Sequence, residues 1–155
     1  MLQTIAGNRQ YTLAEVLGRG RSEMIADAVH DAESCTSGEI VVQIEQELPP
    51  GVSARDAAVA QFQRQGIANT KLNNGILLFI ALDERKIELV ADSGISSRIG
   101  QEQWDFVVQI ISLGFRTGFP AESIVMALAA MGDLLGCHFP WQPGDVNELP
   151  DSPNR

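Results

Sequence analysis

An uninterrupted apolar run over residues 76–82 is the clearest pattern along the chain, and it is too short to span a membrane. Asn-Asn-Gly at 73–75 precedes the run, and Asp-Glu-Arg-Lys at 83–86 follows it. A run bounded in this way predicts a strand covered on both faces, with Leu78 and Ile80 buried. Apolar and polar residues then alternate over 87–92, which predicts a second, partly exposed strand that pairs with the first as a hairpin.

Periodic apolar positions predict further elements on both sides of the hairpin. Residues 39–45 alternate and predict a first strand, and a helix capped by Ser22 should precede it. A second helix should begin after Ser53, and two longer helices should follow Gly94, with a break at Gly118. The expected apolar stripes of the four helices are Ile25, Ala28, Val29 and Ala32; Ala58, Val59 and Phe62; Trp104, Val108, Ile111 and Phe115; and Ile124, Leu128, Met131 and Leu135.

These elements predict the fold class and the domain organisation. Strand, helix and strand in succession indicate a parallel pair joined by a right-handed crossover. We therefore expect an α/β fold: a small α/β/α sandwich, with a mixed sheet of three to four strands and helices on both faces. Residues 1–20 form a poorly patterned segment, 21–139 the α/β domain, and 140–155 a loose tail rich in proline.

Composition limits the classes of binding partner and the cellular compartment that we expect for this protein. The formal net charge of −9 argues against nucleic acid and anionic membrane as partners, because both attract basic proteins. Cys35 and Cys137 lie far apart in sequence, so we expect two free, half-buried thiols. No signal-peptide pattern opens the chain, and no apolar run reaches about 18 residues. The sequence therefore predicts a soluble, cytoplasmic protein.

Several short motifs between residues 36 and 118 occur in the order and spacing of a known family. They are Thr36-Ser37-Gly38-Glu39-Ile40, Asn74-Gly75-Ile76-Leu77-Leu78, Asp83-Glu84-Arg85-Lys86-Ile87, Asp92-Ser93-Gly94-Ile95 and Phe115-Arg116-Thr117-Gly118. In these motifs the chain resembles the TPM domain, named for thylakoid lumen, photosystem-repair and nematode proteins. The resemblance implies an α/β/α sandwich that binds calcium or another divalent ion, with acid phosphatase activity proposed for plant members.

The chain departs from the family pattern where an ion would bind. Many members carry an aspartate at the position of Asn73, and further acids where this chain has Ser96, Ser97 and Arg98. Each change removes an anionic ligand, so we expect any affinity for Ca²⁺ or Mg²⁺ to be weak. Exported members also carry a signal peptide and a membrane anchor, so the chain resembles the stand-alone cytoplasmic branch.

Two acidic ends of the predicted sheet are candidate ion sites. The first candidate combines acids and amides from three segments: Glu39, Asn73, Asn74 and Asp92, with Ser93 beside them. Carboxylate and amide oxygens are ligands that calcium accepts. The second candidate, at the opposite end, holds Glu45, Glu47, Asp83 and Glu84, but Arg85 and Lys86 offset their charge. For either end, the simpler interpretation is a set of solvated strand ends and turns.

Catalytic signatures are absent from the sequence. Cys35 has no arginine six residues later, and no Asp-x-Asp or Gly-x-Ser-x-Gly motif occurs. His30 and His138 lie far in sequence from the acidic segments, which gives no support for general acid–base work. We therefore expect a non-catalytic binding or accessory module with weak divalent-cation binding. The alternatives are a metal-assisted acid phosphatase of low activity and a pure protein-interaction domain.

Overall fold

A computed structural model of the chain describes residues 9–145, 149 and 151–154. Within these residues the sheet has three strands: β1 (Glu39–Glu45), β2 (Gly75–Ala81) and β3 (Lys86–Ala91). β2 lies in the middle, parallel to β1 and antiparallel to β3. The mixed sheet and the predicted hairpin are therefore confirmed.

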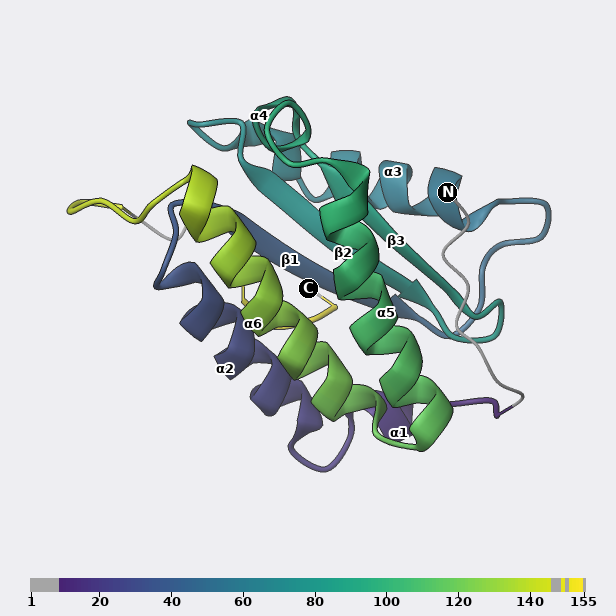
Figure 1. Cartoon of the computed structure of the whole chain (residues 1–155). Helices are drawn as coiled ribbons and strands as arrows, with labels where there is room; N and C mark the ends of the chain where they lie inside the picture. Colours follow the sequence, from purple (N-terminus) through teal and green to yellow (C-terminus); the bar gives the residue numbers. More distant parts are fainter. Residues whose placement is uncertain (1–8, 146–148, 150, 155) are drawn as a thin grey trace.

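Helices cover both faces of this sheet (Figure 1). One face carries α2 (Arg21–Glu33), α5 (Gln101–Thr117) and α6 (Pro120–His138), with the short helix α1 (Leu13–Leu17) at one end of this layer. The other face carries α3 (Ala54–Arg64) and the 3₁₀ turn η1 (Ile67–Asn69), and α4 (Ser93–Ser96) follows β3. This arrangement confirms the predicted α/β/α sandwich.

The unalternating run in β2 is buried because each face of the sheet has its own core. Leu78 and Ile80 face the α2–α5–α6 layer, and both are fully buried, as predicted. Leu77 and Phe79 face α3 on the other side. The core also reaches the segment before residue 21, because the Tyr11 ring is buried and its hydroxyl donates to the Phe115 carbonyl at 2.6 Å.

Local signals placed most helix ends correctly. Ser53 caps α3 by accepting the Asp56 N–H at 3.0 Å, Gly118 ends α5 with a φ of 94°, and Pro120 opens α6. The predicted cap at Ser22 is wrong, because α2 already begins at Arg21, after Gly20. Gly20 takes a φ of 79°, and this left-handed backbone suits the turn from α1 better than a serine would.

The two cysteines form no disulfide, as predicted. Both are exposed, so the expectation of half-buried thiols is wrong. Cys35 lies in the turn just after α2 and Cys137 near the end of α6, and both positions face solvent, which helical periodicity alone did not show.

The outer edge of β1 is covered by the end of the chain. The Asn154 N–H donates to the Val42 carbonyl at 3.1 Å, and its side-chain amide pairs with both backbone groups of Ile44, at 2.6 and 2.8 Å. Pro153 beside it is buried. We expected a loose tail here. Pro153 and Asn154 differ from that expectation, because the edge of β1 offers backbone groups to which Asn154 hydrogen-bonds.

α6 is the one helix among the described residues that is long and apolar enough, by length and composition, to cross a membrane. Half of its apolar window is buried inside the structure. Its buried side packs on α5 and α2, where Gly132 lies against Ala32. Its composition is therefore explained, on that side, by its place in the core.

Candidate functional site

The strand register gathers the predicted ligand segments at one end of the sheet. Glu39 is the partner of Gly75, and Ile76 is the partner of Ala91. The starts of β1 and β2 and the end of β3 therefore lie together, and Glu39, Asn73–Asn74 and Asp92 come from these three segments.

Three of these predicted ligands hold turns in place. The Asn74 side chain is buried and donates to the Ser37 carbonyl at 3.0 Å. Asn73 is exposed, has a φ of 51°, and its carbonyl accepts the Gly94 N–H at 3.0 Å. Asp92 caps α4 by accepting the Ser93 N–H at 2.8 Å, while its Oδ2 is buried without a hydrogen bond to any described residue. These contacts explain the residue types at this corner by backbone geometry.

Glu39 has a different environment, because its neighbour is a second acid from α2. Glu39 is 3% exposed, and Glu33, the last residue of α2, lies beside it. Glu33 Oε2 accepts the N–H of Ile40 at 2.9 Å. Since β1 is an edge strand, this N–H has no strand partner, and the glutamate takes the partner's place.

This crowding changes the acidity of Glu33. Burial, hydrogen bonds to Asp151 and Glu39, and the charge of Glu39 raise the pKa of Glu33 from 4.5 to about 11, against a smaller lowering by the Ile40 N–H. Two carboxylates pressed together in a poorly solvated place cannot both stay ionised. Glu33 therefore keeps a proton at neutral pH.

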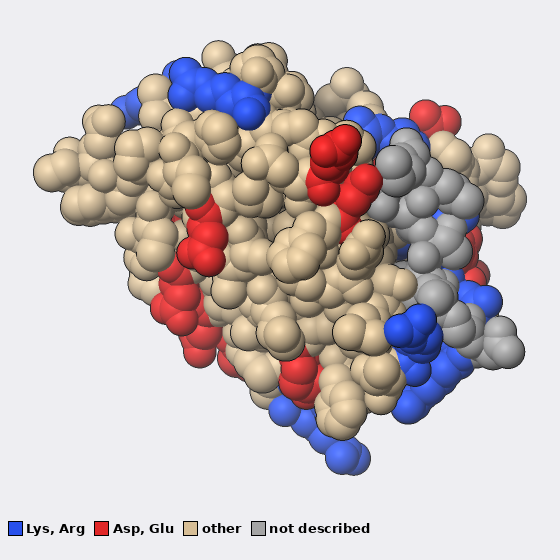
Figure 2. All heavy atoms as spheres, viewed as in Figure 1, with Lys and Arg blue, Asp and Glu red and all other residues tan. Residues whose placement is uncertain are grey.

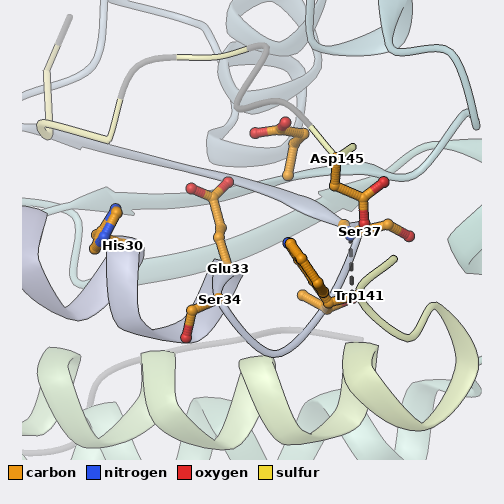
Figure 3. Close-up of a pocket in the computed structure, with 9 residues that line it drawn as sticks. His30, Glu33, Ser34, Ser37, Trp141 and Asp145 are labelled. Atoms are coloured by element: carbon orange, nitrogen blue, oxygen red, sulfur yellow. Dashed lines mark hydrogen bonds between the residues drawn. The ribbon is translucent and has the colours of Figure 1, made fainter. Parts of the chain in front are cut away.

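A pocket of about 230 Å³ opens beside these acids (Figure 3). Its lining comes from the end of α2, the turn into β1 and the segment after α6: His30, Glu33, Ser34, Thr36, Ser37, Gly38, Glu39, Trp141 and Asp145. Carboxyl and hydroxyl oxygens dominate its polar atoms, and the Trp141 ring stands against one side. The pocket can offer a hard cation oxygen ligands from separate segments.

Of the ion ligands predicted from the sequence, only Glu39 lines this pocket. His30 was set aside because it lies far from the acids in sequence, but its Nδ1 is 3.6 Å from Asp151 and its ring lines the same pocket as Glu39. Its side chain is 76% exposed. Glu33 and Asp145 were not singled out at all. The signal available for Glu33 was an acid at a helix end, shortly before an edge strand.

The opposite end of the sheet uses its acids as hydrogen-bond acceptors. Asp83 Oδ1 accepts the Gln46 side-chain amide at 2.7 Å, and Glu84 Oε2 accepts the Leu48 N–H at 2.9 Å. Glu45 accepts the Gln43 amide at 2.8 Å. The Asp83 and Glu84 contacts hold the segment after β1 against the hairpin turn.

Neither end presents a ready-made metal cage. Across residues 9–145, 149 and 151–154, no group of three or more His, Cys, Asp or Glu side chains is arranged to hold a metal ion. A cation in the pocket would depend on hydroxyl, carbonyl or water oxygens for most of its ligands, which is typical of low-affinity sites.

Comparison with known proteins finds a family and solved structures with this architecture. Residues 11–134 match the family model of the TPM domain. The NMR structure of the BA42 protein from the psychrophilic bacterium Bizionia argentinensis is 31% identical, with a TM-score of 0.80 over 94% of this chain and 96% of that one. The N-terminal domain of a P. gingivalis protein shares the fold at 20% identity, with a TM-score of 0.68 over 84% of this chain and 85% of that one. No curated protein sequence is similar enough to count as a match.

Proposed function

The chain belongs to the TPM domain family, and we propose that it is a non-catalytic binding module whose ligand site is the pocket beside Glu33 and Glu39. The proposed ligand is a divalent cation, Ca²⁺ or Mg²⁺, held weakly. Glu39 and Glu33 would supply the anionic oxygens and Ser37 a neutral one, while the exposed Asp145 would contact the ion through water. The bound ion would supply positive charge that links α2, the start of β1 and the segment after α6.

One observation supports this proposal above the others: two carboxyl groups are buried side by side without a basic residue among the pocket's lining other than His30. Such a pair is costly to ionise unless a cation compensates it. In the free protein, the proton on Glu33 removes one of the two negative charges. A divalent ion would replace the proton, and the energy needed to remove the proton keeps the affinity low.

The Asp92 corner is the competing position for the ion at the same end of the sheet. Its unsatisfied Oδ2 is one carboxylate oxygen, and Asn73 and Asn74 already hold turns. We place the ion on the Glu39 side because two buried carboxyls meet there.

An NMR titration with Ca²⁺ and Mg²⁺ tests this proposal. The amides of Glu33, Ser37, Glu39 and Ile40 should shift together, with saturation at about 10⁻⁴–10⁻³ M. Glu39→Gln should remove the shifts, whereas Glu47→Gln, which deletes the same charge at an exposed position of the opposite end, should leave them unchanged. Asp92→Asn should also leave them unchanged. Shifts centred on Asp92 or on Asp83 and Glu84, or no shift at millimolar ion, would contradict the assignment.

The pH dependence of binding provides a second readout. If the ion displaces the Glu33 proton, the affinity should rise about tenfold for each pH unit in the neutral range. Glu33→Gln should abolish this dependence. Hydrolysis of a generic phosphomonoester is the check on catalysis: turnover that survives repurification and disappears with chelator would favour a metal-assisted phosphatase.

A further inference from the structure

The outward face of α5 and α6 exposes large apolar side chains, in a part of the molecule that the ion pocket does not use. Phe106 and Leu113 on α5 are 61% and 51% exposed, and Met126 on α6 is 63% exposed. Ile110 is half-buried between them. Figure 2 shows a broad uncharged surface on this side, over α5 and α6, with acidic side chains mainly towards its borders. We call Phe106, Ile110, Leu113 and Met126 the α5–α6 face.

Helix geometry makes this face continuous. Phe106, Ile110 and Leu113 follow one another at spacings of four and three residues, so they form one stripe along α5. α5 and α6 are consecutive helices that run side by side (Figure 1). They approach so closely that a Cβ on Gly114 would lie 2.0 Å from the Ser123 Cβ. Counting back from this contact, Ile110 is level with Ala127, so the neighbouring Met126, which is exposed, lies at nearly the same height on α6.

We propose that this face binds a second copy of the chain, with α5 of each copy packed antiparallel on α5 of the other. The charge pattern of α5 supports this occupant: Glu102 lies in its first turn and Arg116 in its last. Antiparallel pairing about a two-fold axis places each Glu102 beside the partner's Arg116, and Phe106 over the partner's Leu113. The same stripe is therefore complementary to itself.

The surface relief also fits this pairing. A hollow of about 310 Å³ on α5 is lined by Gln109, Ser112, Leu113 and Arg116. In the antiparallel arrangement, the Phe106 ring of each copy faces the partner's hollow. An aromatic side chain in a recess, rimmed by a charge pair, is the usual pattern of a residue that dominates binding energy. Glu102 and Glu122 at the borders, and the net charge of −9, disfavour an anionic membrane on this face.

Sedimentation equilibrium from about 1 µM to about 1 mM protein tests the proposal, since a contact along one helix is a small interface of micromolar or weaker affinity. The mass should rise from the 16.8 kDa of one chain to twice that value. Leu113→Ser and Phe106→Ser should each weaken the dimer at least about tenfold. Leu72→Ser, at a residue 57% exposed in the loop before β2, is the matched control and should leave the mass unchanged.

A charge exchange separates this pairing from non-specific apolar association. Arg116→Glu should weaken the dimer, and the double variant Glu102→Arg with Arg116→Glu should restore it, because each copy then presents the reversed pair. Circular dichroism should show that all variants fold, since the substituted side chains are exposed. A mass of one chain at the highest concentration, equal effects of Leu72→Ser and Leu113→Ser, or no rescue by the double variant would overturn the proposal. Binding of the monomer to phosphatidylcholine vesicles through Phe106 would also overturn it.

Discussion

Both ends of the sheet carry acidic residues, but these residues lie in different environments. At the hairpin end, Asp83 and Glu84 each accept a hydrogen bond from the segment that follows β1. At the other end, Glu33 and Glu39 are pressed against each other beside a pocket, and one of them keeps a proton. The difference is made by which elements cover each end, because α2 and the segment after α6 enclose the Glu39 side.

This comparison shows that a count of carboxylates does not identify a binding site. Asp83 and Glu84 each accept a hydrogen bond from the segment after β1, and a cation at the hairpin end would compete with those bonds. Glu33 also accepts a backbone N–H, but it shares a poorly solvated place with Glu39, so we expect this pair to respond to protons and cations. We therefore expect the acids at the hairpin end to have a structural role, and Glu33 and Glu39 to respond to protons and cations.

The largest expected effect comes from the strand that both ends share. Leu78 is fully buried on β2, so Leu78→Ala should lower the free energy of unfolding by about 2–5 kcal/mol. Urea denaturation measures this loss. Amide hydrogen exchange should accelerate at Ile40 and at Leu82 together. Acceleration at one end alone would show that the two ends do not depend on a common sheet.

Glu33→Gln should change how stability depends on pH. The unfolded chain loses the Glu33 proton near 4.5 and the folded chain near 11, so between these values the unfolded state binds fewer protons. The stability that this group contributes is complete below 4.5, and is lost as pH rises towards 11, by up to about 1.4 kcal/mol per pH unit.

Glutamine resembles the protonated acid and can still accept the Ile40 N–H. The variant should therefore be more stable than the wild type by about 2 kcal/mol or more at about pH 8–9, as measured by urea denaturation. Glu47→Gln, at the hairpin end, should keep the wild-type pH dependence. Equal slopes for the wild type and Glu33→Gln would mean that Glu33 ionises normally in the folded protein.

The smallest effect is expected at the hairpin end. Glu84→Ala removes the acceptor of the Leu48 N–H and should cost about 0.5–1.5 kcal/mol in unfolding free energy. It should not alter cation binding, and its pH dependence should match that of the wild type. A loss of cation binding in Glu84→Ala would reverse the assignment of the two ends.

Local sequence patterns were sufficient to predict most of the helices and strands. The apolar run at 76–82 required cover on two faces, and Leu78 and Ile80 are buried as predicted. Gly118 and Pro120 placed the break between α5 and α6, because a left-handed turn and a proline at the first helical position act on the residues next to them. Ser22 failed as a cap because the turn from α1 places Gly20 at that position.

The pocket could not be predicted in the same way. His30 and Glu33 lie three residues apart on α2, but Glu39 belongs to β1 and Asp151 to the segment after α6, and local periodicity does not relate these three segments. Their contact depends on β1 being an edge strand, whose outward N–H groups attract Glu33 and Asn154. The strand order β1–β2–β3, which makes β1 an edge strand, is a property of the tertiary structure.

The sequence alone therefore determined most of the elements, the strand pairing and the buried run, because hydrophobic period, turn chemistry and chain direction are local properties. The tertiary structure decided which acids meet, which become buried and which merely accept a backbone N–H. A pKa depends on solvent and neighbours within a few ångströms, and the neighbours of Glu33 include Asp151, which lies more than a hundred residues further along the chain.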